Sequence, residues 1–278
     1  MSKSIESYIN KIHCADCLEL MADFPDNSVD LVVTSPPYDN LREYKGYSFD
    51  FEGIAKQLYR IIKVGGVVVW VVNDATVNGS ETGASFRQAL YFMELGFNLH
   101  DTMIYEKTGI PFPEKVRYNQ IFEYMFVLSK LKPAVANLIK QPTLADSRKK
   151  RFSTFRQSDG SMQGADIVNC SKMPRTNVWR YATGYGHSAV DLAAHQHPAI
   201  FPEQLAIDHI KSWSNPNDLV IDPMTGSGTT CVAAKMLGRR YIGIDISSDY
   251  CKIARKRIAA AEKGITVKEL EKGQKVLF

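Results

Sequence analysis

The sequence predicts an α/β fold in which a doubly wound, mostly parallel sheet carries helices on both faces. Three observations support this prediction. Short apolar runs alternate with segments that have helical character. Aspartate or asparagine follows several of these runs, and one run leads into a glycine-rich turn. Parallel strands end at one edge of a sheet, where such folds bind ligands, so these polar residues are expected to share one rim.

The first half of the chain predicts three strands, each followed by a helix. The strands are the apolar runs Lys11–Cys14, Val29–Val33 and Val67–Val72. The helices are predicted at 17–24, 49–63 and 85–93, and the second has its apolar residues at helical spacing. Gly65 and Gly66 are expected to end the second helix, and Gly96 to cap the third.

The second half continues this alternation around one irregular stretch, residues 131–176, which is polar, basic and without clear periodicity. An antiparallel pair of strands is predicted before it, at 98–105 and 120–128, and a return strand after it, at 177–181. Further helices are predicted at 203–213 and 231–237, and further strands at 218–222 and 241–245. Gly238 would cap the helix at 231–237, and the tail from 262 predicts a solvated helix and strand.

The segment Thr34-Ser35-Pro36-Pro37-Tyr38 directly follows the strand at 29–33. Two prolines prevent the strand from continuing and hold the backbone in a rigid extended turn. At the end of a strand, the turn presents the Ser35 hydroxyl, backbone carbonyl groups and the Tyr38 ring. Two acceptors beside an aromatic ring suit a planar group that carries an exocyclic amine. A proline-terminated loop without a ligand is the plainer alternative.

A glycine-rich turn follows the strand at 218–222 and has the sequence Pro223-Met224-Thr225-Gly226-Ser227-Gly228-Thr229-Thr230. Gly226 and Gly228 would let the backbone approach a ligand closely. Asp245 ends the next strand, where a carboxylate can accept hydrogen bonds from ribose hydroxyl groups. The dinucleotide pattern Gly-x-Gly-x-x-Gly and the P-loop are both unmet. The turn therefore suits a nucleoside-like ligand without a required polyphosphate.

Composition is that of an ordinary globular protein: of 278 residues, 45% are hydrophobic and 23% charged. The five cysteines include one Cys-x-x-Cys, Cys14–Cys17, but no second such pair and no matched histidine pair, so zinc is not expected. His187, His195 and His197 have no paired acids or cysteines nearby, and no metal is expected there either. No apolar run is long enough for a membrane helix and no signal-peptide pattern opens the chain, so a cytoplasmic location is expected.

The positive charge of the chain is concentrated in one segment. Residues 140–180 hold nine basic and three acidic side chains, a net charge of +6, whereas the whole chain carries +4 and the remainder therefore −2. Phe152 and Phe155 interleave with the basic run 148–151. A basic segment with interleaved aromatics favours nucleic acid as the partner, although a solvated loop is the plainer alternative.

The two segments together resemble the S-adenosylmethionine-dependent DNA amino-methyltransferases, which modify the exocyclic nitrogen of cytosine or adenine. The catalytic Ser-Pro-Pro-Tyr comes first and the cofactor segment Asp-Pro-Met-Thr-Gly-Ser-Gly-Thr-Thr last, which is similar to the permuted order called beta. The resemblance covers roughly residues 10–260 and is thinnest across 131–176. It departs from the family pattern at Met224, where phenylalanine is usual; a thioether can still pack on the cofactor.

The resemblance implies a seven-stranded Rossmann-like sheet with an antiparallel edge strand and a small inserted recognition lobe. Residues 1–130 and 177–278 would form the catalytic domain and 131–176 the target-recognition insertion. S-adenosylmethionine, without a metal, would be the cofactor. The family pattern assigns catalysis to Ser35, Pro36, Pro37 and Tyr38. It assigns cofactor binding to Asp16, Thr34, Pro198, Phe201, Asp222, Pro223, Met224, Gly226, Ser227, Gly228, Thr229 and Asp245.

Duplex DNA would be the partner, with the target base flipped out of the stack onto Tyr38. Phosphate contacts are expected from Arg42, Lys45, Arg148, Lys149, Lys150, Arg151, Arg156, Lys172 and Arg175. A nucleoid-associated enzyme of a restriction-modification system is implied. Whether a cognate restriction endonuclease accompanies it, and whether it is a monomer or a homodimer, stay open.

Ser-Pro-Pro-Tyr is typical of N4-cytosine enzymes and favours N4-methylcytosine as the product, with N6-adenine methylation as the alternative. A C5-cytosine enzyme is not expected, because no Pro-Cys dipeptide supplies its nucleophile. Methylation of RNA or of a protein amide usually goes with Asn-Pro-Pro-Tyr, which is not present here. A catalytically inactive DNA-binding module is a third class, but both segments are intact.

Overall fold

The computed structural model describes residues 4–37, 49–109, 116–143, 150–168, 170–184, 186–197 and 200–273; at 150, 151 and 168 it describes the backbone only. The chain divides into two compact units. Unit 1 comprises Met1–Asn137 and Asn177–Phe278, and unit 2 comprises Leu138–Thr176. Both segments singled out by the sequence belong to unit 1.

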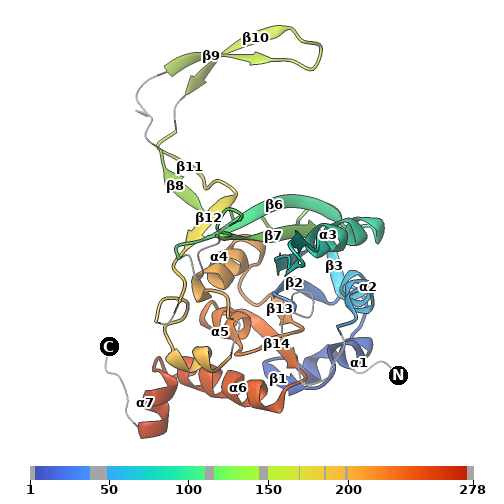
Figure 1. Ribbon diagram of the computed structural model, residues 1–278, viewed down its shortest axis with the longest axis vertical. Helices are drawn as coiled ribbons and strands as arrows, with labels where there is room; N and C mark the ends of the chain where they lie inside the picture. The colour runs from blue at the N-terminus through green and yellow to red at the C-terminus, as the bar shows by residue number, and fades with distance from the viewer. Residues whose placement is uncertain are drawn as a thin grey trace. The chain divides into compact units, whose positions relative to one another are not determined.

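Unit 1 contains an eight-stranded sheet (Figure 1). Its order is β1 (Lys11–Cys14), β14 (Arg240–Asp245), β13 (Leu219–Asp222), β2 (Val29–Thr34), β3 (Ile62–Val72), β7 (Phe122–Ser129), β6 (Asn98–Lys107) and β12 (Val178–Tyr181). β7 is antiparallel to both of its neighbours, and every other neighbouring pair is parallel. The prediction of a mostly parallel α/β sheet is confirmed.

Two details of that prediction are wrong. The sheet has eight strands where seven were expected, and its antiparallel strand β7 is internal where an edge position was expected. The eighth strand is the return strand β12, which pairs parallel to β6 and covers its outer side, whereas β7 is internal because it lies between β3 and β6. β12 alternates exposed and buried residues, and burial of Trp179 and Tyr181 gives the strand an apolar face to hold it there.

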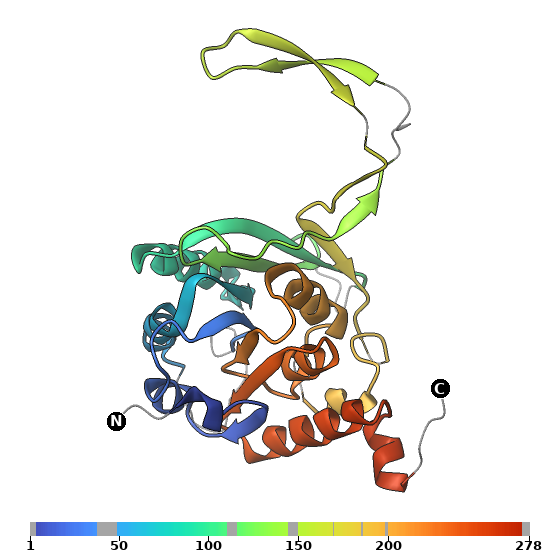
Figure 2. The ribbon, with the colours of Figure 1, turned by 180° about the vertical axis from the view of Figure 1, so that it is seen from behind.

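The helices cover both faces of this sheet (Figures 1 and 2). On one face lie α1 (Cys17–Ala22), α2 (Phe51–Ile61) and α3 (Ala84–Glu94), and on the other α4 (Glu203–Trp213), α5 (Thr229–Met236) and α6 (Ser248–Glu262). α2 ends at Ile61, and Gly65 and Gly66 lie inside β3, so the expectation that they end this helix is wrong. Gly65 adopts φ of 81° and donates its N–H to Lys130 O, which shows a local irregularity of the strand.

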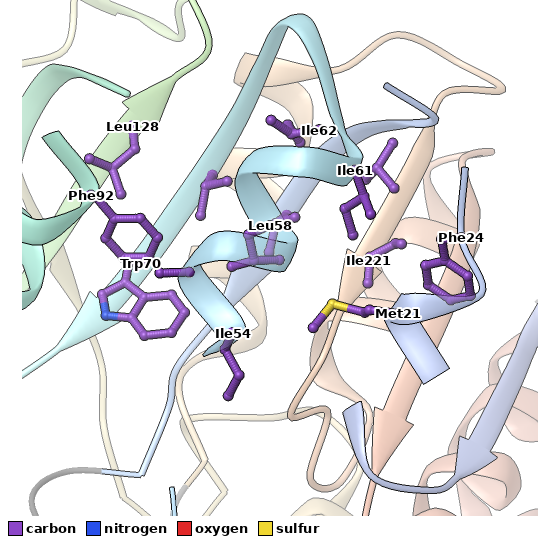
Figure 3. Close-up of a cluster of buried hydrophobic side chains, with 14 of the residues drawn as sticks. Met21, Phe24, Ile54, Leu58, Ile61, Ile62, Trp70, Phe92, Leu128 and Ile221 are labelled. Carbon is purple, nitrogen blue, oxygen red and sulfur yellow. The ribbon is translucent and has the colours of Figure 1, made fainter. Parts of the chain in front are cut away.

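The main hydrophobic core lies between the sheet and the α1–α3 face (Figure 3). Leu58 of α2 lies centrally, between Trp70 and Phe92 on one side and Met21 on the other. All four side chains are fully buried. The one polar atom of Trp70, Nε1, donates to Gln88 Oε1 at 2.8 Å, so the largest buried ring carries no unpaired donor.

Smaller elements complete unit 1. They are η1 (Ile5–Ser7), the hairpin β4 (Thr76–Val77) with β5 (Ser80–Glu81), η2 (Leu192–Gln196) and α7 (Val267–Lys272). α7 begins with a capping box between Thr266 and Glu269, and the strand expected in the tail is not found up to residue 273. Within the described part of the chain, no helix has the length and apolar character needed to cross a membrane.

Unit 2 consists of two short antiparallel ribbons. β8 (Lys140–Pro142) pairs with β11 (Lys172–Pro174), and β9 (Lys150–Arg156) pairs with β10 (Met162–Val168). None of these four strands was predicted. None of the described side chains of unit 2 is buried, so the unit has no hydrophobic core among them.

Candidate active site

The two segments singled out by the sequence lie next to each other at the rim of the sheet. β2 and β13 are adjacent parallel strands, with Leu31 opposite Val220 and Val32 opposite Ile221. At their carboxyl ends, Thr34 Oγ1 donates to Asp222 Oδ1 at 2.7 Å, across 188 positions of the sequence. Thr230 Oγ1 donates to Val33 O at 3.0 Å. The turn after β2 therefore begins beside the glycine-rich turn after β13.

Asp222 is a buried carboxyl group at this junction, with 1% of its surface exposed. Burial raises its pKa to about 6, and the nearby Asp245 carboxylate adds to the rise. Hydrogen bonds from Thr34 Oγ1 and the Met224 N–H oppose it by stabilising the charged form. Thr34 is itself fully buried, so its hydroxyl joins the two strands.

The two glycines of the turn meet different neighbours. Gly228 adopts φ of 85°, and a Cβ there would lie 2.8 Å from Ala254 Cβ of α6. Gly226 adopts φ of 49°, and a Cβ there would lie 3.0 Å from His197 Nε2. Close approach of a ligand was the expected reason for both glycines. At Gly228 the observed reasons are the left-handed backbone and the packing of α6.

Two carboxylates end neighbouring strands on this rim. Asp245, the last residue of β14, accepts the Gly226 N–H through Oδ2 and the Ser247 N–H through Oδ1, both at 2.8 Å. Burial raises the pKa of Asp245, and the two hydrogen bonds, which stabilise the charged carboxylate, lower it in part. Asp16, just after β1, caps α1 by accepting the Leu18 N–H at 2.7 Å through Oδ1. Its Oδ2 receives no hydrogen bond from the described residues.

Arg257 of α6 holds the glycine-rich turn from behind, and sequence reasoning missed it. Its side chain is 1% exposed. Nη1 donates to Ser227 O at 2.7 Å and to Thr229 Oγ1 at 3.2 Å, while Nη2 donates to Glu203 Oε1. Glu203 is the first residue of α4 and accepts the Val190 N–H through Oε2 at 3.0 Å. Arg257 thus links the turn, α6 and α4.

The segment before α4 also reaches this turn. The His197 ring, which lies over Gly226, packs edge-on against Tyr250 at a centroid distance of 4.3 Å. Phe201 is half-buried, and Pro198 lies outside the described residues. Met224 is half-buried and packs against the core cluster of the α1–α3 face. Its expected contact with the cofactor stays a prediction.

The turn that carries Ser-Pro-Pro-Tyr is described as far as Pro37. Ser35 and Pro37 are half-buried and Pro36 is buried, whereas Tyr38, Arg42 and Lys45 lie outside the described residues. Next along the rim, Asn73 after β3 accepts from Gln120 Nε2 at 3.1 Å and donates to Phe122 O at 3.3 Å. These bonds fix the start of β7 beside the rim.

The expected DNA contacts belong to unit 2, apart from Arg42 and Lys45. Arg156 and Lys172 are exposed and Arg175 is half-buried. Arg148 and Lys149 lie outside the described residues, as do the side chains of Lys150 and Arg151. Among the described residues, no group of three or more His, Cys, Asp or Glu side chains could hold a metal ion.

Comparison with known proteins gives the family. The profile of the DNA methylase family that covers N6 and N4 amino-methyltransferases matches residues 29–256. The chain belongs to this family of S-adenosylmethionine-dependent DNA amino-methyltransferases. It is 56% identical over 242 residues to the orphan methyltransferase M.BamHII of Bacillus amyloliquefaciens, covering 84% of this chain and 89% of that protein. It is 29% identical to the type II methyltransferase M.BglII of Bacillus subtilis, covering 90% and 69%.

Solved structures of methyltransferases share the fold. The cytosine-N4-specific PvuII DNA methyltransferase superposes with a TM-score of 0.65 at 21% identity, covering 88% of this chain and 84% of that one. TTHA0409, described as a DNA modification methylase of Thermus thermophilus and complexed with S-adenosyl-L-methionine, superposes with a TM-score of 0.61 at 25% identity. The alignment covers 92% of this chain and 97% of TTHA0409.

Proposed function

We propose that this DNA amino-methyltransferase transfers a methyl group to the exocyclic N4 of a cytosine flipped out of duplex DNA. The observation that carries the proposal is the Thr34–Asp222 hydrogen bond between β2 and β13. It joins the turn that would hold the amine to the turn that would hold the methyl donor. The choice of cytosine rests on Ser35 as the first residue of the Ser-Pro-Pro-Tyr segment.

The residues on the rim fit S-adenosylmethionine. Asp245 uses one acceptor position on each oxygen for a backbone N–H, and a carboxylate oxygen can accept a second hydrogen bond, here from a ribose hydroxyl. Asp16 Oδ2 can accept from the adenine amine. Residues 223–229 and the segment at 198–201 would enclose the remainder of the cofactor. The bound cofactor supplies an electrophilic methyl group on a sulfonium.

Ser35 and Pro36 would act on the amine. Its lone pair is delocalised into the ring, which makes it a poor nucleophile. Hydrogen bonds from the amine to Ser35 Oγ and to the Pro36 carbonyl would localise that lone pair and stabilise the positive charge that develops on nitrogen. A nitrogen–carbon bond forms as the sulfur–carbon bond breaks, and the amine then loses a proton to solvent. Tyr38 would stack on the flipped base, a contact worth about 1–3 kcal/mol.

Transfer of tritiated methyl groups to duplex DNA, RNA and protein tests this function. DNA should be labelled, and Ser35→Ala should lower kcat by about 100-fold or more, while cofactor affinity holds. Ser80→Ala, in the exposed hairpin β4–β5, is the matched control. Label only in RNA or protein would overturn the proposal.

Digestion of the labelled DNA to nucleosides identifies the base. N4-methylcytosine is expected. Label only in N6-methyladenine would overturn the cytosine assignment and leave the family assignment intact. Whether a restriction endonuclease accompanies the enzyme stays open, and the relative M.BamHII is named an orphan methyltransferase.

A further inference from the structure

The β9–β10 ribbon of unit 2 has a well-defined register. Its strands pair over seven positions, from Lys150 opposite Val168 to Arg156 opposite Met162. The Gln157 N–H donates to Ser161 O at 2.8 Å and continues the ladder into the turn. In the turn, Asp159 Oδ1 accepts from Ser161 N at 2.9 Å and from Ser161 Oγ at 2.7 Å. Each described side chain of the ribbon therefore has a fixed place on one of its two faces.

One face of the ribbon packs on itself. The Phe152 ring lies over Gly164 of the opposite strand, so closely that a Cβ at Gly164 would be 2.1 Å from Phe152 Cζ. Thr154 and Arg156 share this face, and Arg156 Nε reaches Gly160 O at 3.5 Å. An aromatic ring over a cross-strand glycine stabilises a two-stranded ribbon. This face serves the ribbon's own folding.

The opposite face, here called the amide face, carries the described side chains of Ser153, Phe155, Gln157, Gln163, Ala165 and Ile167. The register also places Arg151, opposite Ile167, at the far end of this face. None of the six described side chains carries a formal charge. Gln157 Nε2 donates to Gln163 Oε1 at 2.6 Å, which holds two amide groups side by side. Phe155 pairs with Gln163 across the ribbon and is 47% exposed. Amides, a hydroxyl and a ring are the groups that contact base edges and thymine methyl groups.

Folding alone does not account for the amide face. An isolated two-stranded ribbon is marginally stable in water, and none of the described side chains of unit 2 is buried. Residues 138–176 hold eight basic and three acidic side chains, a net charge of +5, which complements a polyanion. The major groove of B-DNA is wide enough to admit a two-stranded ribbon.

We propose that the β9–β10 ribbon enters the major groove of duplex DNA with its amide face against the base edges, and that Gln157 and Gln163 read an adenine of the recognition site. A glutamine amide matches the N6 donor and N7 acceptor of adenine. Lys172, on β11, would contact phosphate and fix position without reading sequence. This inference rests on the proposed function, because it takes duplex DNA as the substrate.

Methylation-sensitive sequencing of DNA from cells that express each variant tests the proposal. The wild-type chain should give one recognition site. Gln157→Ala and Gln163→Ala should relax that site at one adenine and lower kcat/KM on cognate DNA about 10- to 100-fold. Thr154→Ala, on the opposite face of the same ribbon, should leave both unchanged. Lys172→Ala should weaken binding to all duplexes alike and lower the salt slope by about 1.

A duplex carrying 7-deazaadenine at the relaxed position tests the groove. This base lacks the N7 acceptor in the major groove, so wild-type activity should be lower on this duplex than on ordinary DNA. The glutamine variants, which have already lost the contact, should show nearly the same activity on both duplexes. If the wild-type chain methylates DNA and both glutamine variants keep its recognition site and rate, Gln157 and Gln163 do not read the site. The proposed function would then still stand. If the glutamine variants relax the site but the wild-type chain keeps full activity on 7-deazaadenine DNA, the claim that the ribbon reads the major groove is overturned. If the wild-type chain methylates no DNA, the proposed function itself fails.

Discussion

Asp222 is a buried carboxyl group that keeps its proton more tightly in the folded chain than in the unfolded chain. Its pKa is about 6 when folded and about 4 when unfolded. The stability that comes from this proton is fully present below about pH 4 and is lost as the pH rises through about 6. The loss amounts to about 3 kcal/mol.

Asp222→Asn should remove this pH dependence. The amide keeps an oxygen for Thr34 and the Met224 N–H. Relative to wild type, the variant should gain about 3 kcal/mol in its free energy of unfolding between pH 4 and pH 7.5. Urea unfolding over this range measures the difference, with Asp249→Asn controlling for loss of an exposed carboxylate. Parallel profiles for wild type and Asp222→Asn would contradict the prediction.

Arg257 and Glu203 form a buried ion pair behind the glycine-rich turn. Both members are largely buried, and Arg257 also holds Ser227 and Thr229 of the glycine-rich turn. Arg257→Ala leaves Glu203 buried without its partner and should cost about 3–5 kcal/mol of unfolding free energy. Lys256→Ala removes a neighbouring surface pair with Glu271, at least half exposed on both sides, and should cost about 1 kcal/mol or less.

Cofactor affinity separates the role of Arg257 in the turn from simple stability. Calorimetric titration with S-adenosylmethionine, below the unfolding temperature, should show Arg257→Ala binding at least about 10-fold more weakly and Lys256→Ala unchanged. Equal affinity of folded Arg257→Ala and wild type would mean that the turn keeps its shape without the guanidinium.

Gly228 lies where the glycine-rich turn packs against α6. Gly228→Ala meets a left-handed φ of 85° and the α6 backbone, because its Cβ would lie 3.1 Å from Ala254 Cα. Gly238→Ala meets a similar φ of 71° but has no atom within 4 Å. Gly238→Ala should lower the free energy of unfolding by about 1 kcal/mol. Gly228→Ala should lower it by about 1–3 kcal/mol more than that. Urea denaturation of both variants gives the difference, and equal costs would show that α6 yields to the added methyl group.

The strand, turn and helix at 218–236 were predictable because local chemistry determines them. An apolar run, two glycines and a helix cap occur within one short stretch of sequence. Arg257 was not predictable, because it contacts the turn 28 to 30 residues away along the chain. β3 was predicted too short, because Gly65 and Gly66 also stop helices and the pairing with β2 and β7 overrides that preference.

Unit 2 shows where sequence patterns fail for whole-molecule organisation. None of its described side chains is buried on either face of a ribbon, so the apolar alternation that predicts strands is missing. The boundary expected at 131 lies at 138, because Ala134 donates its N–H to Gly65 O and Asn137 donates to Ser212 O in unit 1. The function of unit 2 as the recognition element stays a prediction.

Excision of 138–176 tests this organisation. Since none of its described side chains is buried, replacing it with a short Gly-Ser linker should leave the core of unit 1 intact. The thermal midpoint should change by only a few degrees and S-adenosylmethionine affinity little, while affinity for duplex DNA falls at least about 100-fold. Circular dichroism, calorimetry and a gel-shift assay measure the three quantities. Full DNA affinity after excision would assign binding to unit 1.

The hydrogen bond between Thr34 and Asp222 has a consequence for biosynthesis. In the sheet, β14 and β13 separate β1 from β2, yet the ribosome makes β13, the neighbour of β2, about 190 residues after β2. At roughly 5–20 residues per second, the inner side of β2 waits roughly 10–40 s for its neighbour. Nascent chains stalled before residue 219 should therefore be cleaved readily by protease around β2 and retained by chaperones, whereas released full-length chains should resist.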